Sequence, residues 1–489
     1  MFTDVAAAPA SCVFMVNSPR KKSPSLAARF VIWGVPLLFI VLIAGFLAGR
    51  AWLNAYLESP AFRKLIGGLT SSQLKARGEY MPFHFSGAGI YSDAFKAGGT
   101  AEAFFSTLSA DQIRAEINLH GLWNHAWELD EIDIQRVEIS LGHTASATPV
   151  EAPDLQAAPA AEQAPASPAM HFDWLPQRVD LRKLIIRETD LTWGENTPVQ
   201  GSIKNAPVTL TPDGEAWNIF GEGGTVSQAG MPDFTIDQAR LRYQKPSLFI
   251  TDSQLRCGAG GSVAVTGEVN FAKGLDVLAK LNGISVTPFL REDWRAKLKG
   301  NLSGDLKIRA PLPMQNAPSV EGSLTLNQGE LEALPVLDQI ATFTRTQQFR
   351  QISLSKVSGD FTYAAGKTTV TSFVAESAGL IRTEGAFVIQ NSLIDGTFQV
   401  GVTPSCLQWL PGSQEKVFTV SRDGYLWTTV RLTGPVDNPK EDLSPRLVAA
   451  ATGAVIDTVN GVIQQVPGGD NLKDAPKKLI DDFLTPLLK

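Results

Sequence analysis

The sequence predicts a mainly β protein: a single N-terminal transmembrane helix, followed by a long antiparallel sheet with a few short helices. Two observations predict this class. Residues 30–49 contain no charged residue, and from Met81 onward apolar and polar residues alternate between breaks of Gly, Pro, Asn and Asp. Such alternation is typical of many short antiparallel strands. Hydrophobic residues make up 44% of the 489-residue chain and charged residues 19%, which excludes a disordered protein.

The charge-free segment FVIWGVPLLFIVLIAGFLAG, residues 30–49, lies between Arg29 and Arg50. A helix of this length is about 30 Å long, which matches the hydrocarbon core of a bilayer. The run is longer than the apolar region of a cleavable signal peptide, and no small-x-small cleavage pair precedes Ala51. We therefore expect an uncleaved anchor, with a buried core helix as the alternative.

Basic residues are denser before this segment than after it. The flanks carry Arg20, Lys21, Lys22 and Arg29 on one side, and Arg50, Arg63 and Lys64 on the other. The positive-inside rule then places residues 1–29 in the cytoplasm as a tail and the bulk of the chain across the membrane.

Helical patterns are few. In residues 51–77 an amphipathic helix is predicted directly after the span, because Phe62, Leu65, Ile66 and Leu69 recur at helical spacing. Others are predicted near 288–299, near 331–345 and after 443. Within 321–340, Leu324 and Leu326 alternate as in a strand, Asn327 to Glu330 break the run, and a helix is expected from Leu331.

Residues 144–170 are almost entirely Ala, Pro, Ser and acidic residues. This composition offers no apolar face for packing and predicts a partly extended loop. The segment is either an insertion between strands of one sheet, which we favour, or a spacer between two domains. We expect it to be dispensable for folding.

No constellation of residues predicts chemistry. A net charge of −6 without a basic stripe argues against nucleic-acid binding, and Cys12, Cys257 and Cys406 are too far apart for a metal motif. His120 and His125 do not have helical metal-ligand spacing. GEGGTV at 221 and GAGGSV at 258 are interpreted as hairpin or bulge glycines. We expect a protein without catalytic residues, metal or cofactor.

A sheet of many strands must cover its apolar face with a second sheet, with helices or with something outside the chain. Either the sheet closes into a sandwich, or it forms a trough that takes an apolar ligand.

Residues 278–443 resemble the C-terminal portion of the AsmA-like family, membrane-anchored proteins of bacterial envelopes related to bridge-like lipid-transfer proteins. The segments that carry the resemblance are NGISVTPFLREDWRAKLKGNLSGDLKI, GSLTLNQGELEALPVLDQIATFTRTQQFRQISLSKVSGDFTY, EGAFVIQNSLIDGTFQVGVTP and LTGPVDNPKEDLSPRL. With the strands from Met81 and the anchor, the resemblance covers about two-thirds of the chain.

The resemblance implies a long, twisted sheet folded into a half-pipe over residues 50–442, with an apolar groove for lipid acyl chains. It also implies an inner-membrane anchor, a periplasmic bulk, membrane lipids and envelope proteins as partners, and a role in outer-membrane biogenesis. The residues expected to line the groove are Val263, Val265, Leu324, Leu326, Phe398, Val400 and Val402. Ordinary core packing in a non-catalytic scaffold is the alternative for each, and an envelope enzyme with an unrecognised site is a further one.

Residues 443–489 are expected to contain C-terminal amphipathic helices. The apolar residues of the tail recur every four positions: Leu479, Ile480, Phe483, Leu484, Leu487 and Leu488. Its basic and acidic residues nearly balance, which favours a plug for the protein's own groove or a docking helix over binding to a membrane surface.

Overall fold

The structure, a computed structural model, describes residues 45, 47–52, 54–86, 89–118, 120–121, 126–142, 178–258, 260–312, 317–332, 351–408, 410, 412–436, 438–450 and 452–453. Its contacts divide the chain into two compact units, residues 1–62 and residues 63–489. The predicted insertion 144–170 and the tail from 454 onward lie outside the described residues.

The described residues of the first unit are mainly helical. Residues 47–52 and 54–57 are helical, and α2 (Pro60–Leu74) begins before the unit ends. The ring of Trp52 stacks on that of Tyr56 with centroids 5.8 Å apart. The helix predicted after the span is thus confirmed. The predicted span itself lies almost wholly outside the described part of the chain, within which no helix is long and apolar enough to cross a membrane.

Apart from α2, which continues into this unit, the helices of the second unit are short. They are η2 (Thr287–Phe289), α3 (Glu292–Arg295), α5 (Pro404–Leu407), α6 (Ser413–Lys416) and the helical residues 443–450 and 452–453. The helix predicted near 288–299 is reduced to η2 and α3, because the next strand already begins at Leu298. A helix after 443 is confirmed for the residues described.

Strands make up most of the second unit. Their bounds are β1 (Ala76–Tyr80), β2 (Phe83–Ser86), β3 (Gly89–Gly99), β4 (Phe105–Asn118), β5 (Ala126–Leu141), β6 (Arg178–Leu181), β7 (Leu184–Trp193), β8 (Gly201–Asp213), β9 (Ala216–Gly221), β10 (Thr225–Gln228), β11 (Phe234–Gln244), β12 (Ser247–Cys257), β13 (Gly261–Asn270), β14 (Gly274–Ser285), β15 (Leu298–Ala310), β16 (Ser319–Glu332), β17 (Gln351–Leu354), β18 (Lys356–Ala364), β19 (Lys367–Ser377), β20 (Ile381–Gln390), β21 (Leu393–Val402), β22 (Val420–Arg422), β23 (Tyr425–Pro435) and β24 (Lys440–Glu441).

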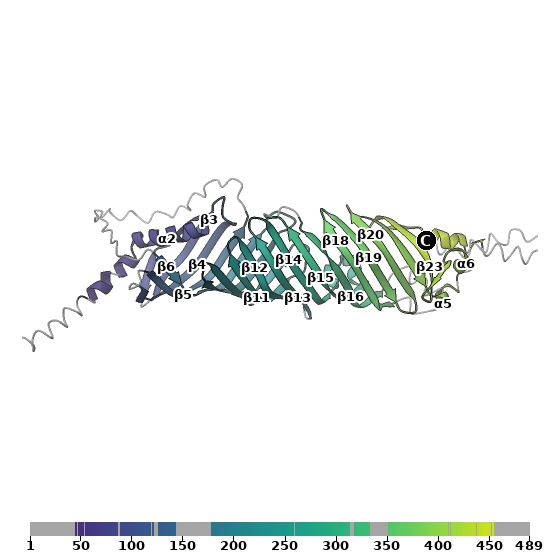
Figure 1. Cartoon of the computed structure of the whole chain (residues 1–489), viewed down its shortest axis with the longest axis horizontal. Coiled ribbons are helices and arrows are strands. Elements are labelled where there is room, and N and C mark those ends of the chain that lie inside the picture. The colour runs from purple at the N-terminus through teal and green to yellow at the C-terminus, as the bar shows by residue number, and fades with distance from the viewer. Residues whose placement is uncertain are drawn as a thin grey trace, which may run out of the picture. The chain divides into compact units, whose positions relative to one another are not determined.

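In the described residues these 24 strands form one sheet, which confirms a mainly β protein. At five positions across the sheet, two strands lie end to end beside the same neighbouring strand. These couples are β1 with β2, β6 with β7, β9 with β10, β17 with β18, and β22 with β24. Figure 1 shows the strands side by side in chain order, from purple to yellow-green.

The sheet is mixed, which corrects the prediction of a purely antiparallel one. β5 pairs in parallel with β6 and with β7, and Ala126 lies opposite Arg178. The other strand pairings in the described residues, from β1–β3 to β23–β24, are antiparallel. Alternation of apolar and polar residues is the same in both kinds of strand pair, so the sequence pattern could not distinguish them.

Tight hairpin turns explain the regular breaks in the sequence pattern. Three two-residue turns have positive φ at both central residues: Ala365–Gly366, Asn391–Ser392 and Asp423–Gly424. This is the type I′ geometry, whose twist matches that of the flanking strands and which favours Gly, Asn and Asp.

β16 runs past the point where the sequence pattern predicts its end. Gln328 has a φ of +52°, and the register with β15 shifts between Lys299 and Asn301, so an extra residue of β16 forms a bulge. The helix predicted from Leu331 is therefore wrong at its start, because Leu331 pairs with Leu298 and Ile352 inside the sheet. Residues 333–350 lie outside the described part.

Side chains cover both outer edges of the sheet. On β1, Ser71 Oγ of α2 donates to Gly78 O and accepts from Gly78 N–H, both at 3.3 Å. On β23, Arg446 donates to Thr429 O at 2.7 Å, and Asp442 Oδ1 accepts from Arg431 N–H at 2.9 Å. Part of the backbone at each edge is thus already hydrogen-bonded, which discourages pairing with another sheet at these residues.

Candidate functional site

The candidate site is one face of the sheet, here called the inner face. Residues directly opposite each other in a strand pair lie on the same face of the sheet. The register therefore identifies, strand by strand, the residues that lie on one face. One such line across the sheet contains Val265, Ala279, Leu306, Gly322, Phe361, Val370, Phe387, Gly396 and Leu432. The inner face is therefore apolar without interruption along this line.

All seven residues predicted to line a groove lie on the inner face. Val263 pairs with Leu281, Leu326 with Leu302, and Val402 with Ile381 and Leu426. Leu324 lies between two glycines, Gly304 and Gly359, on the neighbouring strands. The rings of Phe373, Phe387 and Phe398 lie 5.8–6.1 Å apart, centroid to centroid, so Phe398 belongs to an aromatic group spanning β19 to β21.

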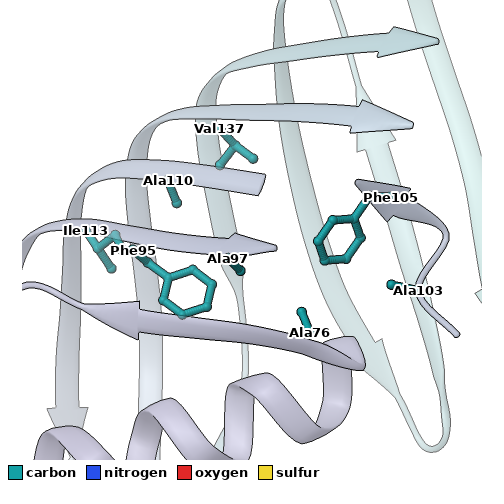
Figure 2. Packing of buried hydrophobic residues seen from close by; sticks show 8 residues of the cluster. All are labelled: Ala76, Phe95, Ala97, Ala103, Phe105, Ala110, Ile113 and Val137. Atoms are coloured by element: carbon teal, nitrogen blue, oxygen red, sulfur yellow. The ribbon is translucent and has the colours of Figure 1, made fainter. Parts of the chain in front are cut away.

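The N-terminal part of the inner face is a packed cluster. Its buried residues are Ala76, Phe95, Ala97, Ala103, Phe105, Ala110, Ile113 and Val137, and Leu74 of α2 packs against them. Figure 2 shows the rings of Phe95 and Phe105 on the inner side of the curved strands. Thr189, which lies opposite Val137 and Ala206, is a polar exception whose buried Oγ1 has no hydrogen-bond partner.

At the C-terminal end, helical segments cover the inner face. Leu407 of α5, Val417, Phe418 and Ala450 form a buried cluster, and Val400 and Val402 pack against it. Phe418 is only 2% exposed. Two of the predicted groove residues therefore contact protein side chains at this end.

Between these ends the inner face is less covered. Leu324, Phe361, Val370 and Phe387 are half-buried. In the described residues, the main contacts of β16, β18, β19 and β20 are with neighbouring strands and not with a helix. Val263 is more enclosed, because it belongs to a buried cluster with Ile284.

The opposite face of the sheet is polar and carries cross-strand ion pairs. Arg136 contacts Asp190, Arg187 donates to Asp133 and Arg309 donates to Asp276. A shallow depression of about 350 Å³ on this face is lined mainly by polar side chains, among them Gln254, Lys280 and Asp305. These groups favour water on this side and do not form an apolar site.

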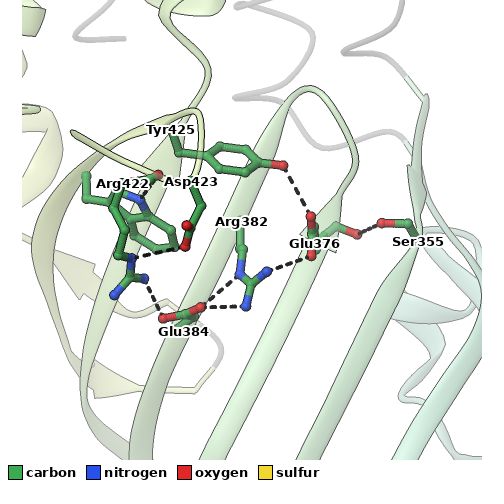
Figure 3. Close-up of polar contacts among 8 residues, drawn as sticks. Ser355, Glu376, Arg382, Glu384, Arg422, Asp423 and Tyr425 are labelled. Atoms are coloured by element: carbon green, nitrogen blue, oxygen red, sulfur yellow. Dashed lines mark hydrogen bonds and ion pairs between the residues drawn. The ribbon is translucent and has the colours of Figure 1, made fainter. Parts of the chain in front are cut away.

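A larger polar network lies on the same opposite face between β19 and β23 (Figure 3). Arg382 donates to Glu384 at 2.8 Å and to Glu376 at 3.1 Å, and Arg422 donates to Glu384 at 2.7 Å. Burial alone would raise the pKa of Glu384, but the hydrogen bonds from Arg422 and Arg382 outweigh it and lower that pKa. Each cation in this network contacts a carboxylate, so it is a structural network and not an anion site.

The two glycine-rich segments lie in connections between strands. Gly223 and Gly224 lie between β9 and β10, and Gly258 between β12 and β13, so both segments join strand to strand. In the described residues no group of His, Cys, Asp and Glu side chains could hold a metal ion. His120 is exposed, and His125 is not among the described residues.

Comparison of the chain with protein families, with curated proteins and with solved structures found no match.

Proposed function

We propose that this chain is a membrane-anchored periplasmic protein that binds or conveys lipids, most simply phospholipids, on the inner face of its sheet. The observation that carries the proposal is the continuous apolar inner face, whose middle contains the half-buried residues Leu324, Phe361 and Phe387 beside the buried residues Leu326 and Phe398. In this role the protein helps to maintain the lipid composition of the bacterial envelope, including its outer membrane. It acts without catalysis or cofactor.

The chemistry of acyl chains fits such a face. Burial of each CH₂ group gains about 0.8 kcal/mol and requires no polar partner. A continuous apolar path therefore binds acyl chains without the specific contacts that a small-molecule pocket needs. Gly304 and Gly359, which lie opposite Leu324 on the neighbouring strands, add no side chain to the inner face, and the side chain of Leu324 lies against Gly304.

The extent of the sheet limits the role. Strands lie about 4.8 Å apart, so the 19 positions across this sheet span about 85 Å along its surface. The hydrogen bonds to Gly78 at one edge and to Thr429 and Arg431 at the other also oppose extension by a second sheet at these residues. We therefore favour one segment of a lipid path, or a lipid chaperone near the inner membrane, over a complete conduit.

A non-catalytic envelope scaffold with a closed core is the second candidate. The cluster around Phe418 favours it, because there Val400 and Val402 already pack against protein. On this alternative the half-buried middle of the inner face would be covered by protein as well.

Mass spectrometry of lipids that co-purify with the full chain tests the proposal. The informative variant is Leu324→Asp on the inner face, and its matched control is Thr325→Asp, the next residue of β16, which is exposed on the opposite face. We expect the wild type and Thr325→Asp to retain lipid, and Leu324→Asp to lose most of it while its far-ultraviolet circular dichroism is kept.

Two results would contradict the proposal. If Leu324→Asp unfolds, the middle of the sheet is an ordinary closed core and the scaffold is favoured. If no lipid co-purifies with the wild type from a membrane extract, the inner face does not bind lipids.

A further inference from the structure

The sheet has two rims, which are the two sides at which its strands begin and end. These opposite rims meet at one place. β3 ends and β4 begins at the first rim, where Gly98 pairs with Thr107. Along the register this rim continues to the start of β11, because Val226 pairs with Phe234. β11 therefore ends, and β12 begins, at the second rim, where Asn270 of β13 also pairs with Ser247.

Phe104 of the first rim contacts Phe271 of the second. Their ring centroids are 5.3 Å apart, and the ring of Tyr243 lies 6.2 Å from that of Phe271. Glu102, beside Phe104, pairs with Lys75 on its own rim and is attracted by Lys245 of the second rim. These residues, Phe104, Phe271, Tyr243, Glu102 and Lys245, are here called the clasp.

The clasp completes a ring. The hydrogen-bonded ladder runs from β4 through β5, β7, β8 and β11 to β13, and the clasp joins its two rims across the inner face. Strands β4 to β13 therefore surround their own apolar face. In the described residues no ring contact joins the rims of β15 to β21 in this way.

Each side of the clasp is anchored independently of the other. On the first rim, Phe105 is 1% exposed within the N-terminal cluster. On the second rim, Asn270 Oδ1 accepts hydrogen bonds from Ala272 N–H and Lys273 N–H, both at 3.0 Å. Phe104 itself is 41% exposed. Parting of the clasp would break an exposed aromatic contact and a solvent-screened attraction, while the packing of Phe105 and the hydrogen bonds of Asn270 within each rim would be kept.

We propose that the clasp is a side gate: closed, it completes the wall around strands β4 to β13, and open, it admits an acyl chain from the side to the inner face of β7 and β8, between the two packed clusters. This proposal rests on the proposed lipid function. It adds that β7 and β8 load through a gate, whereas strands β15 to β21 load directly.

A cross-linking experiment tests the gate. In the full chain with Cys12→Ala, Cys257→Ala and Cys406→Ala, the pair Phe104→Cys and Phe271→Cys is joined by a bis-maleimide. Phosphatidylethanolamine vesicles with a diazirine-labelled acyl chain serve as the probe, and labelled peptides are identified by mass spectrometry. Phe104→Cys alone, capped with a mono-maleimide, is the control.

If the gate operates, locking before the probe is added should lower the labelling rate of β7 and β8 peptides several-fold, with β18 to β20 unchanged. Locking after loading should slow release of the probe from β7 and β8. Phe104→Ala should speed both uptake and release there. Undiminished labelling of β7 and β8 in the pre-locked protein would overturn the gate. A chain that labels nowhere, locked or unlocked, would instead overturn the lipid function.

Discussion

Val400 and Leu324 lie on the same face of the same sheet, yet their surroundings differ. Val400 packs against a buried cluster of Leu407, Val417, Phe418 and Ala450. Both side chains are half-buried, but Leu324 lies between Gly304 and Gly359 of the neighbouring strands. Strand alternation thus determines which face is apolar, whereas segments remote in sequence determine where that face is filled.

The largest expected effect comes from placing a carboxylate at these two positions. Val400→Asp places an unpaired charge against the buried cluster around Phe418 and should lower the free energy of unfolding by roughly 3 kcal/mol or more. Leu324→Asp should cost clearly less, because a carboxylate there can remain hydrated. Urea unfolding followed by circular dichroism measures both, with Gln399→Asp on the opposite face as the control. Equal losses for Val400→Asp and Leu324→Asp would remove the difference between the two regions.

A smaller effect of opposite sign is expected in the N-terminal part of the inner face. The buried Oγ1 of Thr189 lacks a hydrogen-bond partner, so Thr189→Val should raise stability by about 1 kcal/mol. Thr192→Val in the same strand is the control, because the hydroxyl of Thr192 lies 3.2 Å from that of Ser140 and should give no gain when removed. A loss of stability in Thr189→Val would show that this hydroxyl is hydrated, and that the inner face admits water there.

The smallest effect concerns the charged network around Glu384, on the opposite face of the sheet between β19 and β23. The pKa of Glu384 is lowered by Arg422 and Arg382 against the opposing effect of burial. A carboxyl group with a lowered pKa adds stability above its unfolded pKa, and this stability is lost as pH falls through the folded pKa. Melting temperatures from pH 6 to pH 3 should therefore fall less steeply for Glu384→Gln than for the wild type. The corresponding difference in the free energy of unfolding should be below about 1 kcal/mol, because the network is partly exposed. Parallel curves would exclude a contribution from Glu384.

Much of the fold could be predicted from the sequence, because alternation and turn residues are local signals. Val263, Leu324 and Phe398 share a face as their spacing predicts. The cover over Val400 could not be predicted, because Phe418 and Ala450 reach it only through tertiary packing. The bulge at Gln328 resembles a strand end in the sequence, which made Leu331 look helical. The clasp joins Phe104 to Phe271, and no local pattern links two turns so far apart in the chain.

The parallel pairing of β5 and β6 has a consequence for the Ala/Pro-rich segment 144–170. β5 runs from Ala126 to Leu141, yet β6 begins beside Ala126. A strand advances about 3.3 Å per residue, so whatever joins Leu141 to Arg178 must return across roughly 50 Å. Without 144–170 only about ten peptide units remain, and these reach about 35 Å at full extension.

The described ends of this connection, Leu141 and Arg178, therefore predict that residues 144–170 are needed for their length, whereas their composition alone predicts that they are dispensable. We expect a Gly/Ser segment of equal length to leave the melting temperature nearly unchanged. A two-residue link should instead pull β6 out of register and lower the melting temperature sharply.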